Sequence, residues 1–202
     1  MQIRKVVRIP LLLLAMAAAS SALATPALAT PALATHSSHP AAEAVHLDGG
    51  RTSLRIDRGT AGVLADNGVS VTAISGASGQ GRRFTFPITG GDVVPATAAG
   101  TIEHDGGLRF AAGGASLGVE DFVIDTTAGV LTARVSGTHT RVPLLTLDTG
   151  DARIGATKSR LTIRNVEVSL TSEAAGALNA TFGVDLFTEG LLIGTTRTVA
   201  RF

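Results

Sequence analysis

His104 is the residue best placed to do chemistry, because it lies between two carboxylates, Glu103 and Asp105. A histidine beside acidic groups can titrate near neutral pH or coordinate a metal ion. Residues 100–110 read as a β-hairpin in which Ile102 and His104 share one face and the aspartate and two glycines that follow form the turn. The plainer alternative is that His104 hydrogen-bonds this turn. We therefore take His104 as a candidate cofactor-binding residue and predict no catalytic role for it.

Two further patterns invite a catalytic interpretation. Gly114–Gly118 spells G-x-S-x-G around Ser116, the pattern of a nucleophile elbow, which needs a strand, a sharp turn and then a helix. Here residues 119–124 continue as a strand, so the pattern favours a β-turn. The neighbouring Glu120 and Asp121 are predicted to point to opposite faces of that strand and to form no shared site. From these patterns we predict no enzyme.

The remaining histidines and carboxylates indicate no metal site. His36, His39 and His46 fall in a polar segment without a cysteine or carboxylate to complete a ligand set, and His139 reads as a turn residue. The spacing of Asp148 and its neighbours fits a turn better than a Ca²⁺ loop. The sequence therefore predicts neither a resident metal nor a resident cofactor.

The first two dozen residues have the three parts of a secretory signal peptide. Basic residues lie at positions 4, 5 and 8, an apolar run starts at Leu11, and Ala22–Ala24 supplies the small residues of a cleavage site. The apolar run is shorter than the roughly 20 residues that span a bilayer. A five-residue repeat regenerates the cleavage pattern, so the cut is expected after Ala24, Ala29 or Ala34. We predict a signal at 1–24, a low-complexity Ala/Thr/Pro leader at 25–45 and one β-rich domain at 46–202.

Charge and composition limit the classes of partner that the protein is expected to bind. The chain has 17 Lys and Arg against 16 Asp and Glu, and three of the basic residues lie in the signal, which leaves 14 against 16. The sequence has no run of basic residues, which argues against nucleic acid as a partner. With no cysteine, the fold relies on its hydrophobic core. Seven Phe without any Trp or Tyr count against an aromatic-anchored interface. We expect a secreted protein with no membrane contact after cleavage.

Alternation of apolar and polar residues predicts the strands. In Arg160–Arg164 the leucine and isoleucine face one way and the arginines the other, and similar runs recur between glycine-rich turns. Asp125–Gly129 is predicted to be a hairpin turn. The pattern predicts an all-β, antiparallel fold, either a β-sandwich or a partly closed barrel.

Two short helices interrupt this pattern, one in Gly59–Asp66 and one in Ser172–Phe182. The segments around them align with each other: 54–71 matches 168–186 with one inserted residue. This predicts a strand–helix–strand unit near each end of the domain, with each helix closing one end of the sandwich or barrel.

The middle of the chain, from Phe84–Gly91 through Gly100–Phe110 to Gly129–Val135, resembles the exported HtaA-type domain of actinobacteria. The shared order is F-x-F-P-x-x-G-G, then G-x-x-x-x-x-G-x-L-x-F, a strand and a G-x-L-x-A-x-V hairpin, over about fifty residues. The resemblance implies an antiparallel β fold and, in characterised members, haem bound by a tyrosine supported by a histidine. This chain has no tyrosine. Histidine alone could then ligate the iron, and His104 and His139 are the candidates in the folded region.

These observations predict a secreted, non-enzymatic binding or interaction domain of the cell envelope or extracellular medium. Its expected partner is a protein, the cell wall or a small ligand. The alternative is a small-ligand binding protein that holds haem or a lipid in the apolar interior. A closed apolar cavity would favour the ligand, and an exposed apolar patch would favour the interaction domain.

Overall fold

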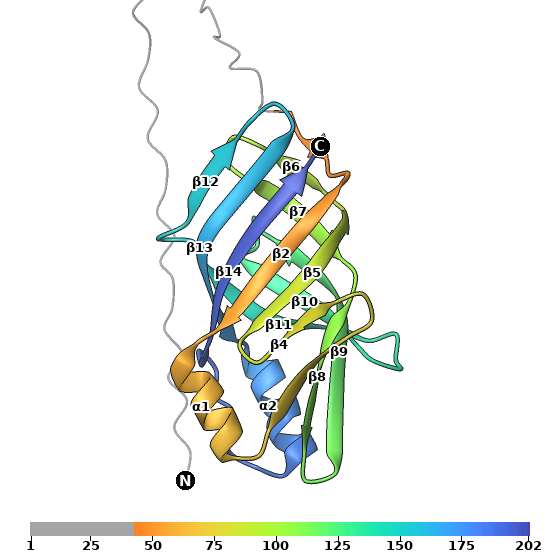
Figure 1. The fold of residues 1–202 in the computed structure, drawn as a ribbon, viewed down its shortest axis with the longest axis vertical. Coiled ribbons are helices and arrows are strands. Elements are labelled where there is room, and N and C mark those ends of the chain that lie inside the picture. The colour runs from red at the N-terminus through yellow and green to blue at the C-terminus, as the bar shows by residue number, and fades with distance from the viewer. Residues whose placement is uncertain (1–42) are drawn as a thin grey trace, which may run out of the picture. The chain divides into compact units, whose positions relative to one another are not determined.

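The computed structural model describes residues 43–202 (Figure 1). The predicted signal peptide, its three cleavage sites and most of the predicted leader, with His36 and His39, lie outside the described residues. The strands are β1 (Val45–His46), β2 (Gly49–Ile56), β3 (Ser70–Ile74), β4 (Ser78–Gln80), β5 (Arg83–Gly90), β6 (Asp92–Val94), β7 (Ala99–His104), β8 (Gly107–Ala112), β9 (Ala115–Asp125), β10 (Val130–Val135), β11 (Arg141–Asp148), β12 (Arg153–Ala156), β13 (Arg160–Leu170) and β14 (Leu192–Arg201). The helices are α1 (Arg58–Asp66) and α2 (Ser172–Phe182).

Eight of the strands form a closed antiparallel barrel. Neighbours pair in the order β7, β5, β2, β14, β13, β11, β10 and β9, and pairing of β7 with β9 joins the two ends of this series. The all-β antiparallel prediction is confirmed, and of its two alternatives the barrel is the one adopted. A closed ring leaves no free strand edge within it, so each barrel strand has its backbone groups paired on both sides.

Alternation places one side of each barrel strand inside. In β2, Thr52, Leu54 and Ile56 are buried while Arg51 and Arg55 are exposed. The core so formed includes Phe84 and Ile102, which have no exposed surface. The barrel interior is therefore apolar with a small number of polar positions, and these positions define the candidate site.

The predicted hairpin over residues 100–110 is wrong. Strands β7 and β8 do not pair with each other, because both pair with the long β9, β8 along its first half and β7 along its second. The bend between them contains Asp105 and Gly106, and Gly106 has a φ of +89°. Eleven residues of β9 are long enough to serve two successive partners, which the local sequence around His104 could not indicate. The predicted turn at Asp125–Gly129 is confirmed: β9 and β10 pair on either side of it, and the Asp125 carboxylate accepts two backbone N–H bonds there.

Both helices have clear caps. Asp57 accepts hydrogen bonds from the backbone of Gly59 and Thr60 at the start of α1, and these bonds lower the pKa of its carboxyl group. Thr171 caps α2, which ends at Gly183 in the left-handed conformation. No helix in residues 43–202 is both long and apolar enough to cross a membrane.

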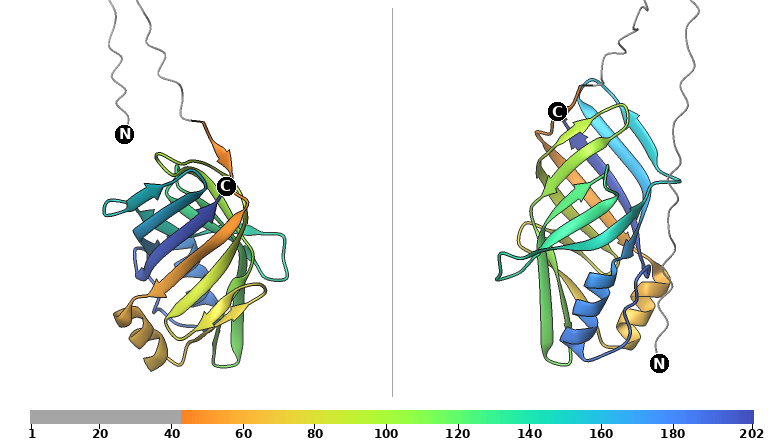
Figure 2. Two further views of the ribbon diagram at one scale, coloured as in Figure 1. Left: turned by 45° about the horizontal axis from the view of Figure 1, so that its top comes forward. Right: turned by 180° about the vertical axis from the view of Figure 1, so that it is seen from behind.

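The predicted placement of one helix at each end is wrong, because α1 and α2 lie at the same end of the barrel (Figures 1 and 2). Leu64 of α1 and Leu178 of α2 line the same cavity. The proposed repeat fails in its last part, since residues 183–191 form no strand and β14 starts only at Leu192. Strands β2 and β13 both pair with β14, so the chains leaving them reach the same end of the barrel.

Candidate functional site

His104 is buried inside the barrel, with 4% of its surface exposed. Its Nε2 lies 2.7 Å from the hydroxyl oxygen of Thr52 on β2, and its Nδ1 lies 3.1 Å from the backbone oxygen of Phe122 on β9. The Thr52 hydroxyl lies 2.9 Å from that of Thr198 on β14. These contacts form a buried polar chain across the barrel: Thr198, Thr52, His104 and the Phe122 carbonyl.

The protons of this chain can be assigned from its acceptors. The Phe122 carbonyl can only accept, so Nδ1–H of His104 donates to it. In the neutral imidazole Nε2 then accepts from the Thr52 hydroxyl, and Thr198 donates to Thr52 in turn. Burial penalises the charged ring and lowers the pKa of His104 to about 4, against a smaller opposing effect of the Phe122 bond. His104 is therefore neutral at physiological pH, with a single orientation.

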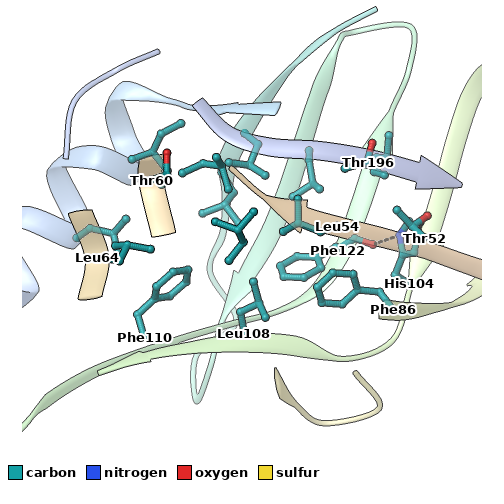
Figure 3. Close-up of a pocket in the computed structure, with 18 of the residues that line it drawn as sticks. Thr52, Leu54, Thr60, Leu64, Phe86, His104, Leu108, Phe110, Phe122 and Thr196 are labelled. Atoms are coloured by element: carbon teal, nitrogen blue, oxygen red, sulfur yellow. Dashed lines mark hydrogen bonds between the residues drawn. The ribbon is translucent and has the colours of Figure 1, made fainter. Parts of the chain in front are cut away.

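A cavity of about 60 Å³ lies between this polar chain and the two helices (Figure 3). Thr52 and His104 lie at one end of the lined space in Figure 3, and Thr60, Leu64 and Phe110 lie at the other. The walls between them are almost entirely apolar; they include Leu54, Phe86, Leu108, Phe122, Leu131, Leu144, Leu145, Leu170, Leu178, Phe187 and Ile193. The lining is therefore apolar along its length, with the mutually bonded Thr52–His104 pair at one end.

A second cavity, of about 200 Å³, occupies the other part of the interior. Ile124 and Thr196 line both cavities, while Thr198 lines only the second and His104 only the first. The polar chain therefore lies where the two cavities adjoin.

The two acidic neighbours of His104 take no part in this arrangement. Glu103 and Asp105 are exposed, whereas His104 faces inward, because successive strand residues point to opposite faces. The predicted alternative in which His104 hydrogen-bonds a turn is also wrong, since its partners are Thr52 and the Phe122 carbonyl.

The prediction that Glu120 and Asp121 point to opposite faces and share no site is wrong. Both contact Arg134 on β10: Oε1 of Glu120 lies 3.2 Å from Nη2, and Oδ2 of Asp121 lies 2.8 Å from Nε. Asp121 has a φ of +53° at a bulge in β9, and this irregularity turns the two adjacent carboxylates to the same side. The hydrogen bond from Arg134 to Asp121 raises the pKa of the guanidinium, so the cluster is a structural ion pair.

The other predicted positions are separate from the cavity. Ser116 lies within β9, paired with Ala111, so no helix follows it. His46 is exposed beside Asp92 at 3.2 Å, and His139 is exposed between β10 and β11. Within residues 43–202, no group of three or more His, Cys, Asp or Glu side chains is placed to hold a metal ion.

Sequence reasoning missed Thr52, Thr198 and the Phe122 carbonyl. The signal for Thr52 was present: it stands two residues before Leu54 and four before Ile56, so it belongs to the inward face of the same strand. A threonine on an otherwise apolar face needs a hydrogen-bond partner. Nothing local identified that partner as His104.

Comparisons with known proteins identify a matching family and similar solved structures. The model of the HtaA family (Htaa) matches residues 60–185, more than half of the chain. The C-terminal domain of HtaA from Corynebacterium glutamicum is similar in structure, with 16% identity, a TM-score of 0.59, and coverage of 77% of this chain and 98% of that domain. A domain-swapped dimer of a histidine-to-alanine variant of that domain has 21% identity and a TM-score of 0.51, and the match covers 70% of this chain and 86% of that one. The heme binding protein HtaB from the same organism has 12% identity and a TM-score of 0.43, and the match covers 79% of this chain and 96% of that one. No curated protein sequence matches the chain significantly.

Proposed function

The chain belongs to the HtaA family, and on that premise we propose that it is an exported, non-enzymatic binding protein that holds a lipid acyl chain in the helix-capped end of its barrel. The observation that carries this proposal is the apolar cavity between α1, α2 and the His104–Thr52 pair. The family resemblance seen in the sequence is confirmed. The ligand and the extracellular role are the proposal.

The lining of the cavity supports an acyl chain. Apart from His104 and three threonines, the side chains around it are aliphatic or phenyl groups. Each methylene moved from water into such surroundings stabilises a complex by about 0.8 kcal/mol. The cavity extends from the helices toward the polar chain (Figure 3), a shape that suits a slender ligand.

A protein-docking role has less support in the described residues. The large apolar side chains exposed in residues 43–202 are Val63 and Ile154. They lie on α1 and β12, which are at opposite ends of the barrel in Figure 1. A contiguous apolar patch, which would favour the interaction domain, is not formed by this pair.

The tyrosine ligation of haem that the family resemblance implies has no counterpart among these residues. The chain has no tyrosine, and His104 is the histidine that lines the cavity, with Nε2 already bonded to Thr52. The cavity of about 60 Å³ is smaller than the roughly 300–1,000 Å³ of typical ligand pockets, so binding either a macrocycle or an acyl chain requires its apolar walls to move apart. An acyl chain needs less width than a macrocycle and no axial ligand.

A titration of the full chain with cis-parinaric acid, a fluorescent fatty acid, tests the proposal. We expect one probe per chain, displaced by unlabelled palmitate. Leu178→Trp fills the cavity from α2, and we expect it to weaken binding at least about tenfold, since a side chain would occupy the ligand's place. Val63→Trp on the exposed side of α1 is the matched control and should bind as the parent does.

Circular dichroism of both variants separates loss of binding from loss of fold. Native mass spectrometry of the chain recovered from culture medium adds an independent readout, in which we expect a fatty-acid adduct. A chain that takes up no probe, or equal weakening by both tryptophans, contradicts the proposal. A co-purified adduct with the mass and Soret absorbance of haem would replace the acyl chain with haem.

A further inference from the structure

The outer surface of the barrel is strongly basic on one side. Strands β12, β13, β14, β2 and β5 lie side by side facing the viewer in Figure 1. Together they carry eight arginines and one acidic residue, Glu167. Acidic residues outnumber basic ones in the chain after its signal, 16 to 14. Positive charge is therefore concentrated on this side of the barrel, although the chain after its signal has a net negative charge.

Seven of these arginines stand directly opposite another arginine on a neighbouring strand. The pairs are Arg55 with Arg83, Arg164 with Arg197, Arg160 with Arg201, and Arg153 with Arg164. We call the six residues of the first three pairs, which lie on β2, β5, β13 and β14, the arginine face. Like charges in directly opposed positions destabilise a sheet. A fold that places such pairs on one surface gains nothing in stability from them.

The arginine face has no internal neutralisation. All six side chains are exposed, and within residues 43–202 none of them forms an ion pair or donates a side-chain hydrogen bond. The ion pairs of Arg134 with Glu120 and Asp121 lie on β9 and β10, away from these strands. The guanidinium groups of the arginine face are therefore free to bind an external anion.

An open groove of about 400 Å³ crosses the centre of this surface. Arg55, Arg83, Arg164 and Arg197 line it. Ser53, Asn165 and Thr195 add hydroxyl and amide donors. Guanidinium groups bind phosphate oxygens through two parallel hydrogen bonds, and several converging on one hollow select a phosphate over a single carboxylate.

We propose that the arginine face binds a linear polyanion that carries repeated phosphate groups. The third pair, Arg160 and Arg201, lies four residues along the strands from Arg164 and Arg197, about 13 Å away. One small anion in the groove leaves that pair unneutralised, whereas a chain of phosphates reaches it. A repeating anion therefore matches the repeating pairs.

A lipid bilayer is a poorer match for this surface. Proteins that bind membranes through a basic face insert aromatic or large apolar side chains beside it. Phe84 and Phe86 of β5 point into the barrel, and the chain has no Trp or Tyr. The groove offers charge and hydrogen-bond donors without such anchors.

The test is a fluorescence-anisotropy titration of the full chain with labelled long-chain inorganic polyphosphate at two salt concentrations. We expect saturable binding that weakens as salt rises. The double variant Arg164→Gln/Arg197→Gln should bind at least about tenfold more weakly, with a flatter salt dependence. Arg197→Gln alone should lie between this variant and the parent.

Arg109→Gln on β8 is the matched control, because Arg109 is also an exposed strand arginine but lies outside the arginine face. It removes the same charge as Arg197→Gln, and we expect it to bind within about twofold of the parent. Equal weakening by Arg109→Gln and Arg197→Gln would show that net charge alone is responsible and would overturn the proposal.

Two other results also overturn it. One is the absence of polyphosphate binding at low salt. The other is binding of phosphatidylglycerol vesicles or single-stranded DNA that polyphosphate does not displace, which would assign the surface to a different class of partner. Leu178→Trp, which fills the interior cavity, should leave polyphosphate binding unchanged, so the acyl-chain proposal and this one can fail separately.

Discussion

Thr52 and His104 are 52 positions apart in the chain, yet the Thr52 hydroxyl donates to Nε2 of His104 across 2.7 Å inside the barrel. The contact joins β2 to β7, and these strands are separated in the barrel by β5. It fixes the orientation of the imidazole, which burial keeps neutral, at the edge of the cavity.

Replacing Thr52 with valine should destabilise the protein by roughly 1–3 kcal/mol, because Nε2 of His104 and the Thr198 hydroxyl lose a buried partner. Valine keeps the shape of threonine, so the loss reports the hydroxyl. Urea denaturation at pH 7.5 measures it. Ser53→Ala, on the outer face of the same strand, should change stability by less than about 0.5 kcal/mol. A Thr52→Val protein as stable as the parent would show that the bond is not formed in solution.

Stability should fall as the pH is lowered from about 6.5 to 4. In the folded protein burial lowers the pKa of His104 to about 4, from 6.5 in the unfolded chain. Between these values the unfolded chain takes up a proton that the folded protein does not. The His104 contribution to this loss reaches roughly 3 kcal/mol at pH 4 and is absent above pH 7.

Denaturation at pH 7.5, 5.5 and 4.5 measures the slope. His104→Gln should flatten it, whereas His139→Gln should retain it, since His139 is exposed. An NMR titration of the His104 ring gives a second readout, and a midpoint near 6.5 would contradict the burial argument.

Leu178→Ala should cost roughly 2–5 kcal/mol of stability, because Leu178 is buried and lines a cavity that the substitution enlarges. The enlarged cavity should accept a bulkier apolar ligand than the parent does. Thermal and urea unfolding measure the loss. Val63→Ala removes apolar surface from an exposed position of α1 and should cost less than about 0.5 kcal/mol. Similar losses in the two variants would place α2 in a different packing.

Two glycine-to-alanine substitutions should change the stability of the protein in opposite directions. At Gly50, with φ +134°, an added methyl group would lie 2.2 Å from the Val199 carbonyl oxygen on β14, so Gly50→Ala should cost about 2 kcal/mol or more. At Gly62, inside α1, nothing lies within 4 Å, and Gly62→Ala should stabilise by about 0.5–1 kcal/mol. Thermal unfolding of the two variants measures both effects. A stabilised Gly50→Ala protein would mean that the backbones of β2 and β14 do not approach closely at Gly50.

The elements with local signals were predictable from the sequence. Alternation of apolar and polar residues marked strand segments such as Arg160–Arg164, and a capping hydroxyl at Thr171 or Ser172 and a glycine at the end marked the helix Ser172–Phe182. The turn at Asp125–Gly129 was equally readable, because an aspartate that bonds its own following backbone needs no distant partner. The family motifs are of the same kind, since they consist of strand and turn residues in fixed order.

Which of these elements contact one another depends on how the whole chain folds. Closure of the ring by β7 and β9 brought His104 to Thr52 and turned a predicted hairpin into two strands that share one neighbour. The same closure put both helices at one end and gathered separate arginines into one face. Each of these relationships depends on the register between strands distant in the chain. That register is set by packing of the whole interior, and no local period in the sequence records it.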